Sequence, residues 1–533
     1  MNTLLTLLTT MLISVPALEN ESAILSSADS LDVKAENVKA KKSKKAKKEL
    51  KYNEKGEIIK TGINLGPLPV VAFDNDRGFQ FGALLNIYQF GDGSTYPNPK
   101  SSWYIEASGY TKGSYKFVLE YTNKSLIPGV RWSTNAGYYN DQALDFYGFN
   151  GYQSVFSTDV LNTSENAGFG IEYLDNKKGN KLAEKNKVPM SFYRHSRQLI
   201  KFKTDFCGEI VRNFFWEAGY NFNWFKTGNF QPKESSGYRV YSPMPTETDP
   251  DNKFYGSGDG IHSLSLYDIY SKAGIITPDH TDKKGRPTGN FVSAVRVGLR
   301  YDSRNVEKNP TKGIWATAHM IMAPRFLGTS DPYYRYNITM RQYIPLGTEK
   351  VIFAYRAAYT GYITGKNASV PWYTLPFYTN MGDQSDQDGF GGYRTLRGMK
   401  LNRLQGRDVV FYNAEIRYRF ISFKLWKQNI SFAISAFNDG GSVILPYKMP
   451  GTENIEDVFR SNSPMLTEAE IAKYSELYRK FVKDQKQDGY HGSAGVGLRF
   501  IMNENFIVAF EYAHCFNKQD GKGAFYLNTG FLF

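Results

Sequence analysis

The sequence lacks the short motifs that mark the common enzyme classes. It contains no Gly-x-Ser-x-Gly turn, no His-Glu-x-x-His pair and no phosphate-binding loop. His491 lies near Ser493, but no acidic residue is placed to orient the imidazole, so the pair predicts no catalytic triad. We therefore expect no enzymatic activity and no cofactor.

Cysteine is scarce as well. Only Cys207 and Cys515 occur, far apart in the chain and both inside strand-like segments. We expect two free thiols on separate strands, with a disulfide as the alternative in an oxidising compartment. No Cys/His cluster has the spacing of metal ligands, so no metal site is predicted.

Long apolar runs are confined to the N-terminus. Residues 1–17 form such a run, which ends in Val15-Pro16-Ala17 and predicts a secretory signal peptide. No later segment reaches the ~18 consecutive apolar residues that a membrane helix needs, and the mean hydropathy is −0.46. If the chain spans a membrane, it must do so as a β-barrel, since only helices and closed barrels satisfy their backbone hydrogen bonds in lipid.

The segment after the signal peptide is polar. Residues 18–61 are rich in Ser, Ala, Lys and Glu without an apolar period, which predicts a disordered, Lys-rich periplasmic tail. Residues 39–51 hold eight lysines and supply much of the net charge of +13. This run serves either to attract anionic lipid headgroups or as a solvated linker. It lacks interleaved aromatic residues and a folded module, so we expect no nucleic acid partner.

What the chain has in abundance is aromatic residues and glycine, with 38 Tyr, 37 Phe and 48 Gly. From residue 68 onward, alternating segments of about ten residues are separated by turns or polar loops, a pattern typical of strands with lipid on one face and water on the other. We count sixteen such segments: 69–75, 78–90, 102–111, 115–123, 130–139, 199–209, 214–226, 292–304, 313–325, 333–346, 350–363, 409–420, 428–440, 491–502, 505–516 and 523–533.

The connections between these segments alternate in length. Every long connection falls on the same side of the predicted sheet: 140–198, 227–291, 364–408 and 441–490. Short periplasmic turns and long extracellular loops are typical of bacterial outer-membrane barrels. We therefore predict an all-β fold over residues 62–533, a sixteen-stranded antiparallel transmembrane β-barrel with long extracellular loops.

Two predicted strands carry the clearest alternation. In residues 409–420, Glu415, Arg417 and Arg419 share one parity, while the other is apolar and aromatic. A dry sandwich core would not accept such a charged face unless every charge were paired, but a barrel lumen does. The last predicted strand, 523–533, alternates and ends on Phe533, which we interpret as a C-terminal barrel signal on the lipid-facing parity.

Four motifs follow one another along this predicted barrel. They are Asp302-Ser303-Arg304-Asn305 with Pro310-Thr311-Lys312-Gly313, then Leu396-Arg397-Gly398-Met399 in a long loop, then Asn413-Ala414-Glu415-Ile416-Arg417, then Phe437-Asn438-Asp439-Gly440-Gly441. In this order they resemble the BamA/TamA family of bacterial outer-membrane insertases and transporters, the bacterial surface antigen barrels. The resemblance covers about 62–533 and implies a place in the outer membrane. Met399 stands where the family has an aromatic residue.

The resemblance also implies a site. In the family, the sixth loop folds back into the barrel and its arginine reaches acidic residues on the next two strands, which correspond here to Glu415 and Asp439. Strand parity places both carboxylates on the polar face. An Arg397 guanidinium would suit such a pair in a partly dry lumen, and Gly398 would let the backbone turn tightly.

The family resemblance implies a function in outer-membrane assembly, handling protein or lipid with outer-membrane lipids and assembly proteins as partners. Family members that insert or export proteins carry POTRA modules before the barrel, and residues 18–61 are too short to hold one. The alternative function is a passive pore or a surface-exposed binding scaffold. The pinned loop itself either tunes barrel opening or is a structural plug.

Overall fold

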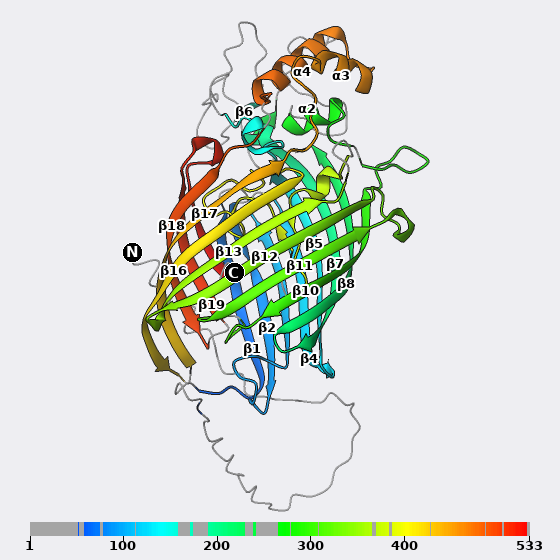
Figure 1. Ribbon diagram of the computed structural model, residues 1–533. Coiled ribbons are helices and arrows are strands. Elements are labelled where there is room, and N and C mark those ends of the chain that lie inside the picture. Colours follow the sequence, from blue (N-terminus) through cyan, green and yellow to red (C-terminus); the bar gives the residue numbers. More distant parts are fainter. Residues whose placement is uncertain are drawn as a thin grey trace, which may run out of the picture.

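A nearly closed cylinder of antiparallel strands forms the body of the molecule (Figure 1). The computed structural model describes Tyr52 and residues 58–533, except for 75–77, 112, 158–170, 174–189, 230–237, 241–264, 278, 308, 365–368, 383–385, 427, 485–486, 504–505 and 530–532. The predicted signal peptide (1–17) lies outside the described residues, as does the predicted tail (18–61) apart from Tyr52 and residues 58–61.

Sixteen strands pair in one sheet, which confirms the predicted antiparallel barrel and its strand count. They are β1 (Gly62–Asp74), β2 (Gly78–Gly91), β3 (Ser101–Tyr110), β4 (Tyr115–Ile127), β5 (Val130–Asp145), β7 (Arg194–Val211), β8 (Phe214–Asn229), β10 (Asn290–Asp302), β11 (Gly313–Ala323), β12 (Tyr333–Leu346), β13 (Thr348–Tyr362), β16 (Asp408–Leu425), β17 (Gln428–Leu445), β18 (His491–Met502), β19 (Phe506–Cys515) and β20 (Ala524–Thr529). Several strands are longer than predicted, because residues at their ends continue the backbone hydrogen bonds of the sheet although their side chains no longer alternate between polar and apolar.

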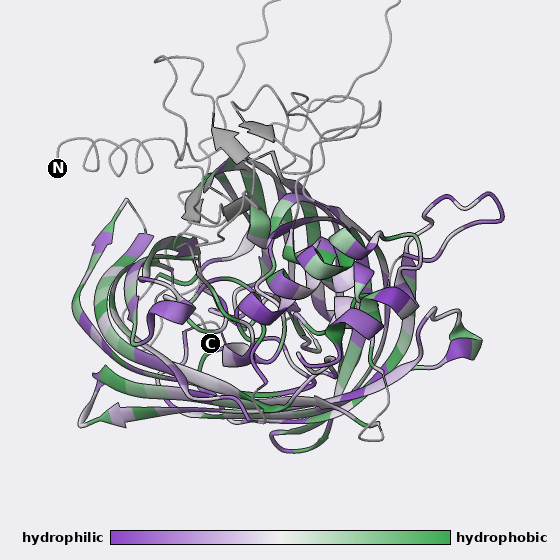
Figure 2. Cartoon of the chain, turned by 90° about the horizontal axis from the view of Figure 1, so that it is seen from above, coloured by the Kyte–Doolittle hydropathy of each residue, from purple (hydrophilic) through white to green (hydrophobic). Residues whose placement is uncertain are grey.

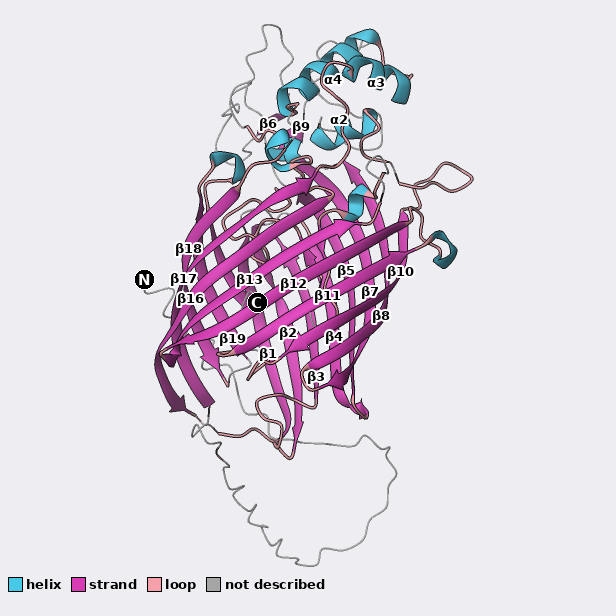
Figure 3. Ribbon diagram, viewed as in Figure 1, coloured by secondary structure: helices cyan, strands magenta, loops and turns pink. Residues whose placement is uncertain are grey.

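The remaining elements belong to the connections at one end of the barrel, most of them to the long loops (Figure 3). They are the strands β6 (Ile171–Tyr173), β9 (Tyr238–Val240), β14 (Phe377–Tyr378) and β15 (Gln387–Asp388), the helices α2 (Leu266–Lys272), α3 (Ile455–Asn462) and α4 (Glu468–Phe481), and the 3-10 turns η1 (Gly151–Gln153), η2 (Met190–Tyr193), η4 (Arg325–Leu327), η5 (Trp372–Thr374) and η6 (Lys518–Asp520). Within the described residues, no helix is both long and apolar enough to cross a membrane.

Alternation along the strands separates an exposed outer face from a buried inner face. On β16, Ile416 and Tyr418 are exposed, whereas Asn413, Glu415 and Arg417 are buried. Polar and charged side chains are buried here because loop segments fill the lumen, as the view along the barrel axis shows (Figure 2). The inner wall is therefore a packed polar core rather than a wet channel surface.

An aromatic cap closes the loop end. Residues 146–151 pack here against α2, α4 and η5 through Phe146, Tyr270, Trp372 and Phe481. Two of the helices begin with reciprocal capping boxes, Ser265 with Asp268 in α2 and Thr467 with Glu470 in α4. These caps satisfy the first backbone N–H groups and fix where each helix enters the cluster.

The two edge strands, β1 and β20, are neighbours in space. Among the described residues, however, no ladder of hydrogen bonds pairs them, whereas all other neighbouring strands are paired. The residues that precede β1, 58–61, run along the opposite end of the barrel and form what we call the N-terminal strap (Figure 1). The Ile58 N–H donates to Asn429 Oδ1 at 3.2 Å and Lys60 Nζ to Gln428 Oε1 at 2.9 Å. The strap thus joins the start of β1 to the first residues of β17, on the far side of the seam.

Candidate functional site

The loop between β13 and β16, residues 363–407, enters the barrel and crosses the lumen. After the short β14–β15 hairpin it turns through Gly391 and Gly392, where a single bridge joins Gly392 to Leu396. Thr395 braces this turn, since its Oγ1 accepts the Gly391 N–H at 2.9 Å. The turn delivers the next residue, Arg397, to the wall formed by β16, β17 and β19.

Arg397 is fully buried and meets three carboxylates, an arrangement that we call the arginine anchor. Its Nε and Nη2 donate to the two oxygens of Asp439 at 2.8 and 3.0 Å, and its backbone N–H donates to Asp439 Oδ2 at 3.0 Å. Nη1 donates to Glu415 Oε2 at 3.1 Å and to Glu511 Oε1 at 2.8 Å. The structure therefore brings the two predicted acids to the arginine and adds a third, Glu511.

The arginine anchor is balanced by two further cations. Arg417 Nε lies 3.2 Å from Glu415 Oε1, and Arg499 Nη2 lies 2.8 Å from Glu415 Oε1 and 2.7 Å from Glu511 Oε1. Three guanidinium groups thus face three carboxylates. Charges buried at this depth are tolerable only when they are paired and hydrogen-bonded, and this cluster meets both conditions.

Two neighbours fix the position of the loop backbone. The Phe437 ring lies 3.4 Å from the Arg397 guanidinium carbon, so the cation rests on an aromatic face. The Gly398 N–H donates to the Tyr526 hydroxyl at 2.9 Å. Gly398 has φ 87°, and a Cβ there would lie 3.0 Å from Ala513 Cβ, so both the conformation and the space require glycine.

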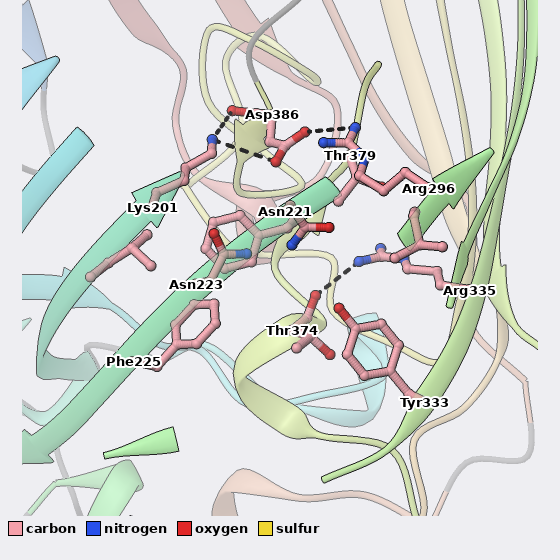
Figure 4. Close-up of a pocket in the computed structure, with 13 residues that line it drawn as sticks. Lys201, Asn221, Asn223, Phe225, Arg296, Tyr333, Arg335, Thr374, Thr379 and Asp386 are labelled. Atoms are coloured by element: carbon pink, nitrogen blue, oxygen red, sulfur yellow. Dashed lines mark hydrogen bonds and ion pairs between the residues drawn. The ribbon is translucent and has the colours of Figure 1, made fainter. Parts of the chain in front are cut away.

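A second contact, the aspartate anchor, holds the same loop to the opposite wall (Figure 4). Asp386 faces Lys201 Nζ at 3.6 Å and Arg296 Nη2 at 3.7 Å, and its Oδ1 accepts the Asn380 N–H at 2.9 Å. The Gly382 N–H donates to Asp205 Oδ2 at 3.0 Å. These ion pairs are longer than those of Arg397.

A small cavity of about 20 Å³ lies beside the aspartate anchor, lined by Asn223, Arg296 and Arg335 among others. The Arg296 nitrogens and Asn223 Oδ1 have no hydrogen-bond partner in the described part of the chain. The cavity has room for one water molecule. Because both a donor and an acceptor lack partners, a water that bridges them fits this cavity.

A histidine latch joins the loops at the mouth of the barrel. His491 Nδ1 lies 2.6 Å from Asp520 Oδ1, and its Nε2 lies 3.1 Å from Asp488 Oδ2. The Tyr152 ring stacks on the imidazole at 3.9 Å, and its hydroxyl donates to Asp520 Oδ2. Burial raises the pKa of Asp488, but the hydrogen bond and charge of His491 outweigh burial and hold this pKa below its usual range. Across the described residues, no group of three His, Cys, Asp or Glu side chains could hold a metal ion.

Phe533 does not lie where the alternation of the last strand predicted. β20 ends at Thr529, and Phe533 is buried inside the barrel against Tyr343 and Ile352. Arg417 Nη2 donates to the Phe533 backbone oxygen at 3.1 Å. Phe533 therefore lies on the inner side of the wall, so a parity argument cannot be carried past the end of the described ladder. The role of Phe533 as a barrel signal stays a prediction.

Both cysteines are buried and form no disulfide within the described residues; Cys207 lies on β7 and Cys515 on β19. Cys207 Sγ accepts a hydrogen bond from Arg300 Nη2 at 2.8 Å. His491 and Ser493 are also near each other in the chain, but His491 belongs to the latch and the Ser493 hydroxyl donates to the Arg397 carbonyl oxygen. Neither pair forms a reactive centre within the described residues.

Comparisons with known proteins place this barrel in a family. Residues 102–533 match the Omp85 superfamily domain, and no curated protein sequence matches the chain. Similar solved structures include BamA from Haemophilus ducreyi lacking POTRA domains 1–3, with 15% identity, TM-score 0.45, and 88% of this chain and 70% of that chain covered. Another is CdiB from Escherichia coli, with 9% identity, TM-score 0.45, and 88% and 62% covered.

The family match covers far more than half of the chain and includes all four motifs from which the BamA/TamA resemblance was predicted. It confirms that resemblance and the predicted place in the bacterial outer membrane. The sixteen strands and the inner-face charges agree with what the strand alternation predicted, and the inward-folded loop agrees with what the family resemblance implied. The chain belongs to the Omp85 superfamily of outer-membrane β-barrel proteins.

Proposed function

We propose that the protein acts in outer-membrane assembly and handles protein or lipid at the seam between β1 and β20. The observation that carries this proposal is the missing ladder between these two strands in the described residues. Among the described residues, β1 has 13 residues and β20 has six, so the described part of β20 leaves much of the edge of β1 uncovered. An uncovered strand edge presents backbone N–H and C=O groups that another strand can pair with.

The filled lumen supports this proposal over a passive pore. The arginine and aspartate anchors hold the loop 363–407 across the barrel, and the aromatic cap covers its mouth. Arg296, Arg356 and Arg499 on the inner wall and Arg397 in the loop are almost fully buried. An open water-filled pore would leave such side chains solvated. We therefore propose that the activity takes place at the wall of the barrel and not along its axis. We propose no catalytic reaction for this protein.

The partners follow from the surfaces. Outer-membrane lipids contact the exposed apolar residues of the outer face, such as Leu299, Ile338 and Ile416. Assembly proteins are the proposed partners at the end of the barrel that carries the short turns and the N-terminal strap. These partners follow from the proposed activity and from the family.

A crosslink across the seam tests the proposal. In a background with Cys207 and Cys515 replaced by Ser, one cysteine in β1 and one in β20 would be oxidised in the folded barrel. A matched control would join Val297 of β10 to Met320 of β11, which are register partners in a closed part of the wall. We expect the seam crosslink to abolish complementation of a depleted strain and reduction to restore it. Equal complementation by the oxidised seam and control variants would refute the proposal.

Conductance separates the proposal from the pore alternative. We expect the purified barrel in a planar bilayer to show no stable open channel, because the loop and cap remain in place. A steady conductance in the unaltered protein would favour the passive pore. Normal assembly of other barrels after depletion, together with retained ligand binding to the loop surface, would favour the binding scaffold.

A further inference from the structure

One row of inner-facing residues runs across five neighbouring strands. In register, Trp315 of β11 pairs with Arg341 of β12, Arg341 with Arg356 of β13, Arg356 with Asn413 of β16, and Asn413 with Asp439 of β17. All five side chains are buried. The row therefore links the arginine anchor at one end to a pair of arginines in its middle.

Arg341 and Arg356 are like charges directly opposite each other, an arrangement that destabilises a sheet. Arginine cannot relieve the repulsion by losing its proton, because its pKa is too high in proteins. Neither guanidinium forms an ion pair with a carboxylate in the described part of the chain. A counter-charge is therefore missing at the centre of this row.

The nearest carboxylates on the row are already engaged. Asp439 accepts hydrogen bonds from Nε and Nη2 of Arg397. The cluster around Arg397 holds three cations and three anions and is therefore neutral. At the other end, Asp302 accepts from Arg304 Nε at 2.8 Å and Nη2 at 2.6 Å. Arg341 and Arg356 thus add two buried positive charges that no carboxylate side chain in the described part of the chain balances.

The same place has an excess of hydrogen-bond donors. Among the described residues, no hydrogen-bond partner is present for five buried polar atoms: Arg341 Nε and Nη1, Arg356 Nη1, the Trp315 indole nitrogen and the Tyr343 hydroxyl oxygen. Arg356 uses its other groups on Asn413 Oδ1 at 2.8 Å and on the carbonyl oxygen of Arg394 at 3.1 Å. The Arg341 guanidinium carbon lies 3.9 Å from the centre of the Trp315 ring, which is no acceptor for its edge N–H groups. A bound anion would supply both the missing hydrogen-bond acceptor and the missing negative charge.

We propose that Arg341 and Arg356 bind a small inorganic anion of the halide class in the lumen wall. The size follows from burial, since the two residues are only 2% and 1% exposed and leave no opening for a lipid headgroup or a peptide. The anion accepts from Arg341 Nε or Nη1 and from Arg356 Nη1. Because Arg356 also holds the loop backbone at Arg394, the bound anion stabilises the segment that leads into the arginine anchor.

Bromide diffraction on the unaltered protein tests the site directly. The folded barrel would be crystallised or soaked in bromide, and anomalous scattering recorded at the bromine edge. We expect a peak within about 3.5 Å of nitrogen atoms of both arginines. Strong peaks elsewhere with none at this pair, or a water that shows no anomalous signal, would overturn the proposal. This measurement does not depend on any variant folding.

Thermal unfolding in detergent tests the same site in solution. At fixed ionic strength, replacing gluconate by chloride should raise the Tm of the unaltered barrel by about 2–4 °C. Arg341→Gln should remove this chloride dependence and should be the more stable of the two proteins in gluconate, since it ends the like-charge contact.

Arg335→Gln is the matched control, because Arg335 lies on the same face of β12 but has its own acceptors, Thr360 Oγ1 at 3.0 Å and the Thr374 oxygen at 2.9 Å. This variant should lower the Tm in both salts and keep the chloride response. An equal chloride response in the unaltered protein and in Arg341→Gln would refute the assignment.

Discussion

The two anchors of the loop 363–407 differ in how tightly they hold it. At the arginine anchor, five hydrogen bonds of 2.8–3.1 Å join Arg397 to three carboxylates. At the aspartate anchor, Asp386 faces two cations at 3.6 and 3.7 Å beside a cavity of about 20 Å³. Both are buried, so exposure does not explain the difference. The arginine anchor therefore holds the loop through short hydrogen bonds, whereas the aspartate anchor holds it through longer ion pairs beside a cavity of the size of a water molecule.

The largest effect is expected when the tight anchor is broken. Arg397→Ala would leave Asp439, Glu415 and Glu511 with one cation too few in a dry site. Removing one partner of such a buried pair costs about 3–5 kcal/mol. We expect a lower Tm of the folded barrel and faster proteolysis of the loop. Unchanged melting and unchanged cleavage would show that the contacts of Arg397 do not hold the loop.

A smaller loss is expected at the neighbouring glycine. Gly398→Ala would place a methyl group about 3.0 Å from Ala513 Cβ at a backbone angle that alanine disfavours. Strain of this kind costs about 1–3 kcal/mol. Thermal unfolding of the variant measures it, with Gly285→Ala as a control, since Gly285 has positive φ but open space around it. If the two substitutions cost the same, backbone strain alone accounts for the loss.

The loose anchor should matter less. Asp386→Asn keeps the acceptor for the Asn380 N–H and removes only the charge that faces Lys201 and Arg296. Asp205 remains within 3.8 Å of Arg296, so we expect a loss of about 1–2 kcal/mol, below the usual cost for a buried pair. In a double variant that also carries Arg397→Ala, the two losses in free energy of unfolding should add to within about 0.5 kcal/mol if the anchors act independently. A loss at Asp386 as large as at Arg397 would remove the distinction between them.

The smallest effect is expected from acid at the histidine latch. Because the pKa of Asp488 is lower in the folded protein, its contribution to stability is present above the unfolded value near pH 4 and is lost as the pH falls further. Cleavage of the loop 446–490 by an acid-active protease should therefore increase below about pH 4. Asp488→Asn should flatten this dependence. The Tyr152 hydroxyl still donates to Asp520 in both proteins, so the barrel itself should remain folded.

The acidic residues of the arginine anchor could be predicted from the sequence, whereas the aspartate anchor could not. Glu415 and Asp439 stand on regular strands, where a period of two residues assigns each side chain to a face. Glu511 was missed, although its inward parity on β19 was a usable signal. Asp386 lies in a loop whose path no periodicity encodes, so its partners on β7 and β10 could not be found. The register row of Arg341 and Arg356 needs strand pairing, which a single sequence does not give.

The N-terminal strap has a mechanical consequence. Its contacts reach Gln428 and Asn429, the first residues of β17, while its own chain continues into β1. A pull on the chain ahead of Ile58 is therefore shared by two strand groups on opposite sides of the seam. Tension on this segment would hold the two edges of the seam together, and loss of the three polar contacts that join Ile58 and Lys60 to β17 would let each edge move separately.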